Sequence, residues 1–281
     1  MAISVAYLGP AGTYTDEAMR ASAPGEIDPQ ARSTVYETVM AVQDGQADRA
    51  VVPIENSLEG AVAATLDALA GEANRVRIFA EVVHPIHHCL VAARELPLEE
   101  IVRVLSHPQA TAQCARYLRE ELPAAERVHV TSTAEAVRTV GAADEPWAAL
   151  GSRLSADLYD CVVLADRVED HPDNVTRFVW LAQADAGMAR VDGAAKTSIV
   201  FWGFNDSAPG ALVSVLRELS DRSLNLTKIE SRPRRGGLGR YMFFADLEGH
   251  ADEPNVAEAL AALRARVDTL RVLGSYPAAE G

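Results

Sequence analysis

The chain has 281 residues, of which 48% are hydrophobic and 23% charged, as in ordinary soluble globular proteins. This length suits two domains better than a single core. Its 40 acidic residues outnumber the 26 basic ones, and the resulting net charge of −14 argues against a nucleic-acid or anionic-membrane surface.

The cysteines and the N-terminal residues indicate a cytoplasmic protein. Cys89, Cys114 and Cys161 are odd in number, far apart and free of Cys-x-x-Cys spacing, which argues against a disulfide framework or a zinc site. The first residues read as a strand rather than a secretion signal, and no apolar run approaches the length of a membrane span.

The first part of the chain alternates strand-like and helix-like segments, which predicts an α/β domain. The first strand, residues 3–8, ends in a glycine-containing turn, and Thr13 can cap the helix that follows. A helix N-terminus after such a turn can bind an anion. The turn lacks the third glycine of a dinucleotide fingerprint.

Two further predicted strands end in polar residues. Residues 50–54 lead into Glu55, Asn56 and Ser57, at the carboxyl edge where open α/β sheets bind ligands. The second strand, residues 101–105, leads into Ser106. A helix after it places Gln109 and Gln113 one turn apart, so that all three side chains can face one crevice, although Ser106 can equally serve as a plain helix cap.

The histidines His84, His87 and His88 are close together, but they do not predict a metal site. Neighbouring residues on a strand point to opposite faces, and no acidic or cysteine ligand accompanies these histidines. Packing and hydrogen bonding account for them better.

The segment 173–178 carries the residues best suited to chemistry. It leads from a turn-prone run into the apolar strand 178–182. The Thr176 hydroxyl can donate or accept a hydrogen bond, and the Arg177 guanidinium can hold a carboxylate with two hydrogen bonds. Taken alone, the segment also fits a loop with a solvated arginine.

Residues 185–195 lack periodicity and contain two glycines, which predicts a linker. The strand and helix patterns after it follow the order βαββαβ, which predicts a ferredoxin-like domain. We therefore expect an α/β domain over 1–184, a linker over 185–195 and a second domain over 196–281.

Taken in order, six motifs resemble those of prephenate dehydratase with its C-terminal ACT regulatory domain, along essentially the whole chain. They are Gly9–Thr13, Pro53–Ser57, Ser106–Gln109 with Gln113, Asn174–Phe178, Gly210–Val213 and Glu230–Pro233. No segment resembles a fused chorismate mutase, so the resemblance implies the monofunctional two-domain form.

The resemblance implies a bilobal catalytic domain similar to type II periplasmic binding proteins, with the active site between the lobes. It implies conversion of prephenate to phenylpyruvate, water and carbon dioxide in phenylalanine biosynthesis, with no metal or organic cofactor. It also implies feedback inhibition by L-phenylalanine at the ACT domain of a homodimer or homotetramer.

The resemblance makes Thr176 the catalytic residue, as a hydrogen-bond donor to the leaving oxygen. Glu55 either relays a proton to that site or only orients its neighbours. Arg177 is expected to bind a substrate carboxylate, and Phe178 to pack beneath the site. The other expected substrate-binding residues are Thr13, Asn56, Ser57, Ser106 and Gln113. The phenylalanine site is expected between subunits, at Gly210, Ala211, Leu212, Asn225, Glu230 and Ser231.

Two other functions remain open from the sequence. Arogenate dehydratase acts on the analogue with an amine in place of the side-chain keto group, and the contact that distinguishes the two substrates cannot be identified in one sequence. A non-catalytic amino-acid or carboxylate sensor is the alternative from another class, because both domains resemble binding modules.

Overall fold

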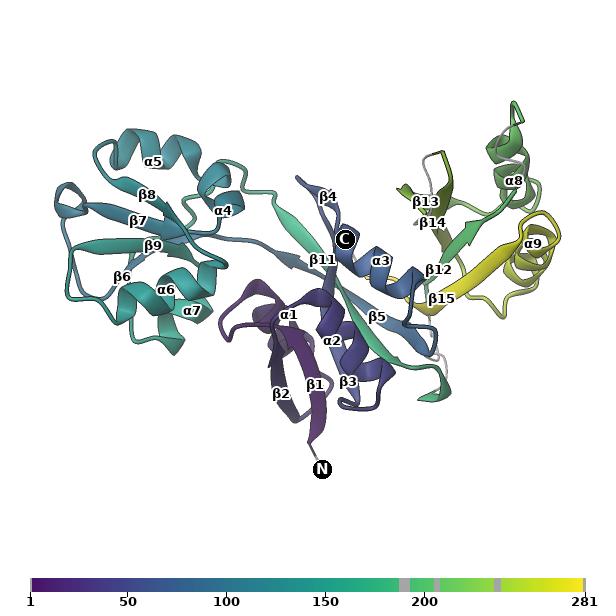
Figure 1. The fold of residues 1–281 in the computed structure, drawn as a ribbon, viewed down its shortest axis with the longest axis horizontal. Helices are drawn as coiled ribbons and strands as arrows, with labels where there is room; N and C mark the ends of the chain where they lie inside the picture. Colours follow the sequence, from purple (N-terminus) through teal and green to yellow (C-terminus); the bar gives the residue numbers. More distant parts are fainter. Residues whose placement is uncertain (1, 187–192, 205–207, 235–238, 280–281) are drawn as a thin grey trace.

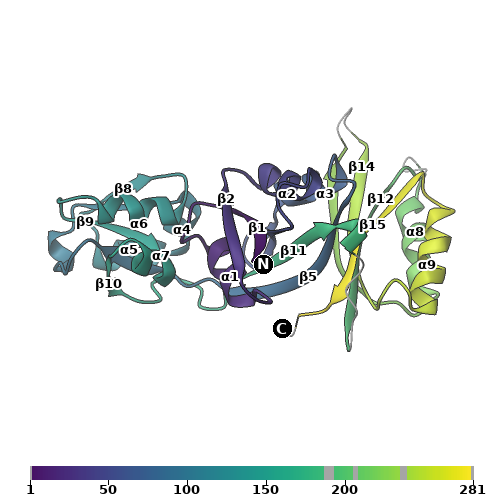
Figure 2. The same ribbon diagram turned by 90° about the horizontal axis from the view of Figure 1, so that it is seen from below.

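Three β-sheets organise the chain, one in each of three bodies that lie in a row (Figure 1). The computed structural model describes residues 2–186, 193–204, 208–234 and 239–279. A central lobe lies between an outer lobe and a C-terminal domain (Figures 1 and 2).

The central lobe is built on a sheet with strand order β2-β1-β3-β11-β5, with the short β4 paired to β3. Strands β1, β2 and β3 are parallel neighbours, whereas β11 runs antiparallel to both β3 and β5. The elements are β1 (Ile3–Leu8), α1 (Tyr14–Ser22), β2 (Ile27–Arg32), α2 (Val35–Gln43), β3 (Arg49–Asn56), β4 (Gly60–Ala61), α3 (Ala63–Ala70), β5 (Val76–Pro85) and β11 (Val175–Gln183).

The outer lobe has a five-stranded sheet of order β10-β6-β9-β7-β8. The Ser132 hydroxyl accepts a hydrogen bond from Glu135 N and so caps helix α6, as the sequence pattern predicts. The elements are β6 (Cys89–Ala92), a 3-10 turn (Leu98–Glu100), β7 (Arg103–Ser106), α4 (Pro108–Gln113), α5 (Ala115–Glu121), β8 (Glu126–His129), α6 (Thr133–Gly141), β9 (Trp147–Gly151), α7 (Arg153–Leu158) and β10 (Val162–Ala165).

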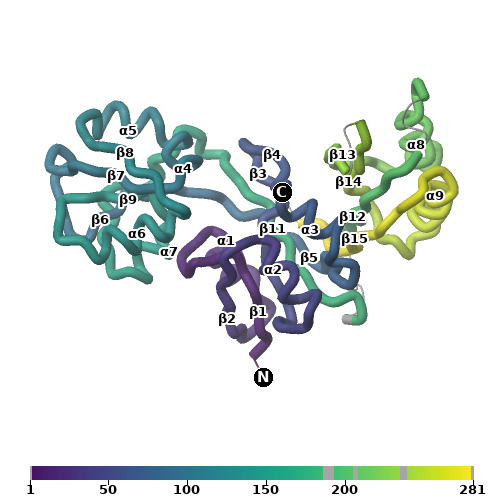
Figure 3. Tube along the Cα trace, in the orientation of Figure 1, coloured from purple at the N-terminus to yellow at the C-terminus, as the bar shows by residue number. Residues whose placement is uncertain are grey.

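The chain enters the outer lobe directly after β5 and returns from it directly before β11, so two neighbouring strands of the central sheet connect the lobes (Figure 3). Both crossings lie beside the polar residues that the sequence singles out. Residues from both lobes can therefore meet at this junction.

The C-terminal domain has the predicted order βαββαβ and a sheet of order β13-β14-β12-β15. The expected fold class, a bilobal α/β domain followed by a ferredoxin-like domain, is thus confirmed. The elements are β12 (Ala195–Trp202), α8 (Ala211–Ser220), β13 (Leu226–Pro233), β14 (Tyr241–Glu248), α9 (Pro254–Arg264) and β15 (Thr269–Pro277). The predicted linker overlaps a 3-10 turn (Ala184–Ala186), but its residues 187–192 lie outside the described residues.

The C-terminal sheet turns one face to helices α8 and α9 and the other to the central lobe (Figure 2). The second face shares a hydrophobic core with the central lobe, in which Val200, Phe244 and Tyr276 pack with Ile78 and Val179. Burial of this apolar surface holds the two domains together. Among the described residues, no helix has both the length and the apolar character needed to cross a bilayer.

Gly274 in β15 makes the closest approach between the two sheets. A Cβ atom on this residue would overlap with the carbonyl group of Ile78 in β5, both of whose atoms belong to the backbone and cannot rotate away. Close packing of the domains therefore requires glycine here.

We expect Gly274→Ala to lower the free energy of unfolding by about 1–3 kcal/mol, the usual cost of overpacking. Gly25→Ala is the matched control, because a Cβ on the exposed Gly25 has no atom within 4 Å. Urea denaturation of both variants checks this prediction. Equal midpoints for the two variants would contradict the tight contact.

Candidate active site

A cleft of about 300 Å³ lies where the two lobes meet. Residues from both lobes line it, and six of the residues expected there are among them: Thr13, Asn56, Gln109, Gln113, Thr176 and Phe178. Lining residues that the sequence analysis did not assign to the site include Tyr14, His88, His107 and Asn174. The cleft between the lobes is therefore the candidate active site.

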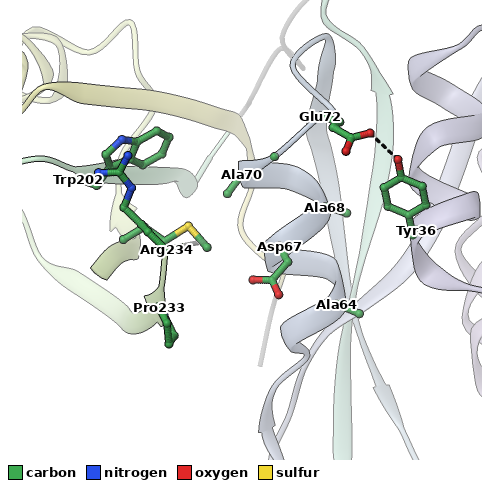
Figure 4. Close-up of a pocket in the computed structure, with 11 residues that line it drawn as sticks. Tyr36, Ala64, Asp67, Ala68, Ala70, Glu72, Trp202, Pro233 and Arg234 are labelled. Carbon is green, nitrogen blue, oxygen red and sulfur yellow. Dashed lines mark hydrogen bonds between the residues drawn. The ribbon is translucent and has the colours of Figure 1, made fainter. Parts of the chain in front are cut away.

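A second hollow, of about 460 Å³, lies between the central lobe and the C-terminal domain (Figure 4). It contains none of the predicted site residues. Its carboxylates already have partners, because Asp67 pairs with Arg232 at 2.7 Å and Glu72 accepts a hydrogen bond from Tyr36 at 2.5 Å. This hollow is therefore a weaker candidate for the active site.

Asn56 controls the hydrogen bonding of Thr176. The Asn56 Oδ1 atom accepts hydrogen bonds of 3.0 Å from the backbone amides of Leu58 and Glu59, so the Nδ2 group must point the other way. This Nδ2 group donates to Thr176 Oγ1 at 2.9 Å and to Asn174 Oδ1 at 2.8 Å. Thr176 Oγ1 is thus an acceptor toward Asn56 and keeps its own hydrogen for a second partner.

The same chain of hydrogen bonds fixes the tautomer of His88. Asn174 Nδ2 donates to Gln113 Oε1 at 3.2 Å, so His88 Nε2, 3.0 Å from the same oxygen, must also be a donor. In a neutral ring His88 Nδ1 is then the acceptor, and it lies 2.7 Å from the Tyr14 hydroxyl, whose single hydrogen it shares with the His87 carbonyl oxygen at 2.9 Å. Burial lowers the pKa of His88, in agreement with a neutral ring that carries one hydrogen.

The other titratable lining residues are also neutral near pH 7. Burial raises the pKa of Tyr14 well above its ordinary value, and burial lowers the pKa of His107. Gln113 Nε2 is buried and has no hydrogen-bond partner within the described part of the chain. The cleft therefore offers neutral donors, one of them unused, to a bound molecule.

Arg177 and Glu55 do not line the cleft in this structure, where the sequence analysis expects them. Side chains alternate along a strand, so Arg177 points away from the face that carries Thr176 and Phe178. Its guanidinium contacts Glu55, Glu81 and Asp246 instead, at distances of 2.7–3.4 Å. In this position Arg177 is paired with carboxylates of the protein itself, and Glu55 is paired with Arg177 and Lys228.

Ser106 and Ser57 also lie outside the lining of the cleft, contrary to expectation. Ser106 is fully buried, and its hydroxyl donates to Leu150 O at 3.0 Å, which braces β7 against β9. The Ser57 hydroxyl accepts from Val175 N at 3.0 Å and so holds the start of β11. Both serines support the site rather than line it.

The glycine-containing turn 9–13 does not form the anion site that the sequence suggests. Gly12 N already donates to the buried carboxylate of Asp16 at 2.9 Å. Thr13 lines the cleft, but its hydroxyl donates to Leu8 O at 2.9 Å and caps helix α1. The turn instead joins the lobes, because Ser152 Oγ donates to Gly12 O at 3.0 Å.

Sequence reasoning missed Tyr14, His88, His107 and Asn174 as lining residues. Strand alternation could not have identified His88, because His87 and His88 lie in the segment between β5 and β6 rather than on a strand. Asn174 stands two residues before Thr176, on the crossing segment. Within the described ranges, no group of three or more His, Cys, Asp or Glu side chains could hold a metal ion.

The predicted phenylalanine-binding residues divide into two groups in the C-terminal domain. Gly210 has a φ of +79° and stands at the start of α8 with Ala211 and Leu212. Asn225 follows the other end of α8 and donates to Glu248 Oε1 at 2.8 Å. The helix has 10 residues and is about 15 Å long, so these two groups are far apart within one chain. Glu230 and Ser231 lie on the edge strand β13.

Comparison with known proteins identifies the family. The family model for prephenate dehydratase matches residues 5–186, and the model for the ACT domain matches residues 204–265. The chain belongs to the prephenate dehydratase family. It is 40% identical over 277 residues to prephenate dehydratase from Amycolatopsis methanolica, with 99% of this chain and 89% of the relative covered.

Two solved structures have the same architecture. Prephenate dehydratase from Arthrobacter aurescens in complex with L-Phe is 38% identical, with a TM-score of 0.90 over 98% of this chain and 90% of that one. A protein described as GqqA, a novel type of quorum quenching acylase, is 31% identical with a TM-score of 0.87 and 98% coverage of both chains. We call the C-terminal domain the ACT domain from here on.

The orientation of Asn56 predicts the effect of Asn56→Asp. The substitution replaces a donor with an oxygen that faces the oxygens of Asn174, Val175 and Thr176. We expect the free energy of unfolding at pH 7 to fall by about 1–3 kcal/mol, the cost of an unsatisfied buried group. Its oxygen-rich surroundings raise the pKa of the new carboxyl, so the loss is complete above that raised pKa and shrinks as the pH falls.

Asn74→Asp is the control, because exposed Asn74 only accepts a hydrogen bond through its side-chain oxygen, from Gln43. Urea denaturation at pH 7 and pH 5 measures both variants. A loss for Asn56→Asp that equals that of the control, or that grows on acidification, would show that Asn56 is not the donor.

Proposed function

We propose that the cleft between the lobes converts prephenate to phenylpyruvate, water and carbon dioxide, with Thr176 as the catalytic residue. The observation that carries this role is the hydroxyl of Thr176, which accepts from Asn56 and keeps its own hydrogen for a substrate in the cleft. Family membership supports the reaction, and the chain is an enzyme of the lyase class.

The reaction needs little from the protein beyond orientation and hydrogen bonding. Loss of the ring carboxylate as carbon dioxide sends its electron pair into the ring, and the ring hydroxyl leaves with the electrons of its C–O bond. Thr176 donates a hydrogen bond to the departing oxygen, where negative charge develops in the transition state. An aliphatic alcohol is a weak acid, so the proton that completes the water molecule comes from solvent.

The cleft favours prephenate over arogenate. Neutral donors such as Gln113 Nε2 can bind the keto group and carboxylates of prephenate. Arogenate carries an ammonium group in place of the keto group, and an ammonium ion requires acceptors, best of all a carboxylate. Among the described residues that line the cleft, none carries a carboxylate.

L-Phenylalanine inhibits the enzyme by binding to the ACT domain, and we place its site between two copies of the chain. Gly210 and Asn225 flank opposite ends of α8, so one protomer cannot bring both to a small amino acid. Two ACT domains packed in opposite directions bring the first end of one helix beside the second end of its partner. The enzyme is accordingly a homodimer or a larger homo-oligomer, and as a biosynthetic enzyme it acts in the cytoplasm.

We expect Thr176→Ala to lower kcat for prephenate about 10²-fold or more, as when a transition-state donor is lost. Thr176→Ser is the matched control, since it keeps the hydroxyl, and its kcat is expected to stay within about tenfold of the wild type. Phenylpyruvate formation at neutral pH, with and without L-phenylalanine and with arogenate in parallel, measures these effects.

A near-normal kcat for Thr176→Ala would remove Thr176 from its role while leaving the reaction in place. Turnover of arogenate alone would move the function to the sister reaction. If neither substrate reacts while phenylalanine still binds, the chain is a sensor and not an enzyme.

A further inference from the structure

A cluster of six charged side chains lies between the central lobe and the ACT domain, on the side of β11 opposite the cleft. Its centre is Arg177, whose side chain is only 11% exposed. The guanidinium lies 2.7 Å from Asp246 Oδ2, 3.2 Å from Glu81 Oε2 and 3.4 Å from Glu55 Oε2. Asp246 belongs to the ACT strand β14, whereas Glu55 and Glu81 belong to strands β3 and β5 of the central sheet.

Two lysines of the ACT domain complete this Arg177 cluster. Lys196 Nζ lies 2.6 Å from Glu81 Oε1, and Lys228 Nζ lies 3.0 Å from Glu55 Oε2. The central lobe thus supplies two acids and one base, and the ACT domain supplies two bases and one acid. The three positive and three negative charges balance only when the domains are docked. Separation of the domains would leave buried ions without their partners, which is costly.

The environment of Arg177 holds it firmly in the charged form. Burial alone would lower the pKa of the guanidinium, but the carboxylates of Asp246 and Glu81 raise it above its ordinary value. Of these two residues, Asp246 comes from the ACT domain. The shortest ion pair of this arginine, 2.7 Å to Asp246 Oδ2, therefore crosses the domain interface.

Arg177 is also next to Thr176 in the chain, at an irregular point of the sheet. The pairing of β11 with β3 shifts register between Arg177 and Phe178. The extra residue at this point is Ile54 of β3, so β3 carries the bulge and β11 runs beside it. Because Arg177 and Thr176 are adjacent residues, movement of the Arg177 side chain shifts the backbone that carries the Thr176 hydroxyl. It thereby also affects the 2.9 Å hydrogen bond from Asn56 to that hydroxyl.

We propose that Arg177 is a positioning residue, which links the docking of the ACT domain to the orientation of the Thr176 hydroxyl in the cleft. This inference rests on the proposed dehydratase function. A ligand of the ACT domain can change catalysis only if it favours one arrangement of the domains over another. The Arg177 cluster provides a direct route for that preference, since it joins both domains and the catalytic strand.

Asp246→Asn tests the link without a change in the cleft. The substitution keeps the shape of the side chain and an acceptor for Ser198 Oγ, which donates to Asp246 Oδ1 at 2.6 Å, but it removes the charge that faces Arg177. We expect kcat for prephenate to fall about 5-fold or more, with KM within about twofold. The orientation of the Thr176 hydroxyl affects a hydrogen bond that is made in the transition state and not in the bound substrate. The phenylalanine concentration for half-inhibition should rise at least about fivefold.

Arg271→Met is the matched control for a weakened domain interface. Arg271 of β15 donates across the interface to the carbonyl oxygens of Ala70, Gly71 and Ala73, and these bonds do not involve β11. We expect both kcat and half-inhibition to stay within about twofold of the wild type. Lys196→Gln is a second test variant, since it removes the charged ACT partner of Glu81, and its changes should have the same directions as those of Asp246→Asn.

The outcomes separate this inference from the proposed function. If Asp246→Asn and Lys196→Gln behave like Arg271→Met while the wild type turns over prephenate, the link is wrong and the function stands. If the wild type has no dehydratase activity, the proposed function fails and the inference fails with it. If Asp246→Asn does not fold, Lys196→Gln alone decides between the first outcome and a confirmed link.

Discussion

The alternation of side chains along β11 determines how the parts of this enzyme are related. Successive residues of a strand face opposite sides of the sheet, so Thr176 and Phe178 line the cleft while Arg177 enters the domain interface. A register shift of one residue would reverse every one of these assignments. The pairing of β11 with β3 and β5 therefore places the cleft on one face and the domain contact on the other.

The cleft itself depends on a directed chain of hydrogen bonds. The backbone amides of Leu58 and Glu59 donate to the side-chain oxygen of Asn56, and the side-chain nitrogen of Asn56 donates to the hydroxyl of Thr176. Each donor is fixed by the group before it, so the free hydrogen of Thr176 follows from the backbone rather than from ionisation. Electrostatic preorganisation of this kind suits a reaction in which the protein stabilises a leaving oxygen and performs no covalent step.

The sequence predicted the fold class and the position of the cleft, but not the face on which each residue lies. Apolar runs and capping residues such as Ser132 are local signals, and they located most elements. Strands β2 and β8 escaped notice because they are polar edge strands, the first with Pro29 inside it. Arg177 was misplaced because a motif cannot show that its partner, Asp246, lies far along the chain in another domain.

Amide hydrogen exchange of the wild type tests most directly whether β11 connects the ACT domain with the cleft. The measurement compares the peptide that covers residues 175–178 with and without L-phenylalanine, at a concentration that inhibits fully. If β11 connects the ACT domain with the cleft, L-phenylalanine changes the exchange of this peptide as well as that of the ACT domain. Full inhibition with changes confined to the ACT domain would contradict it.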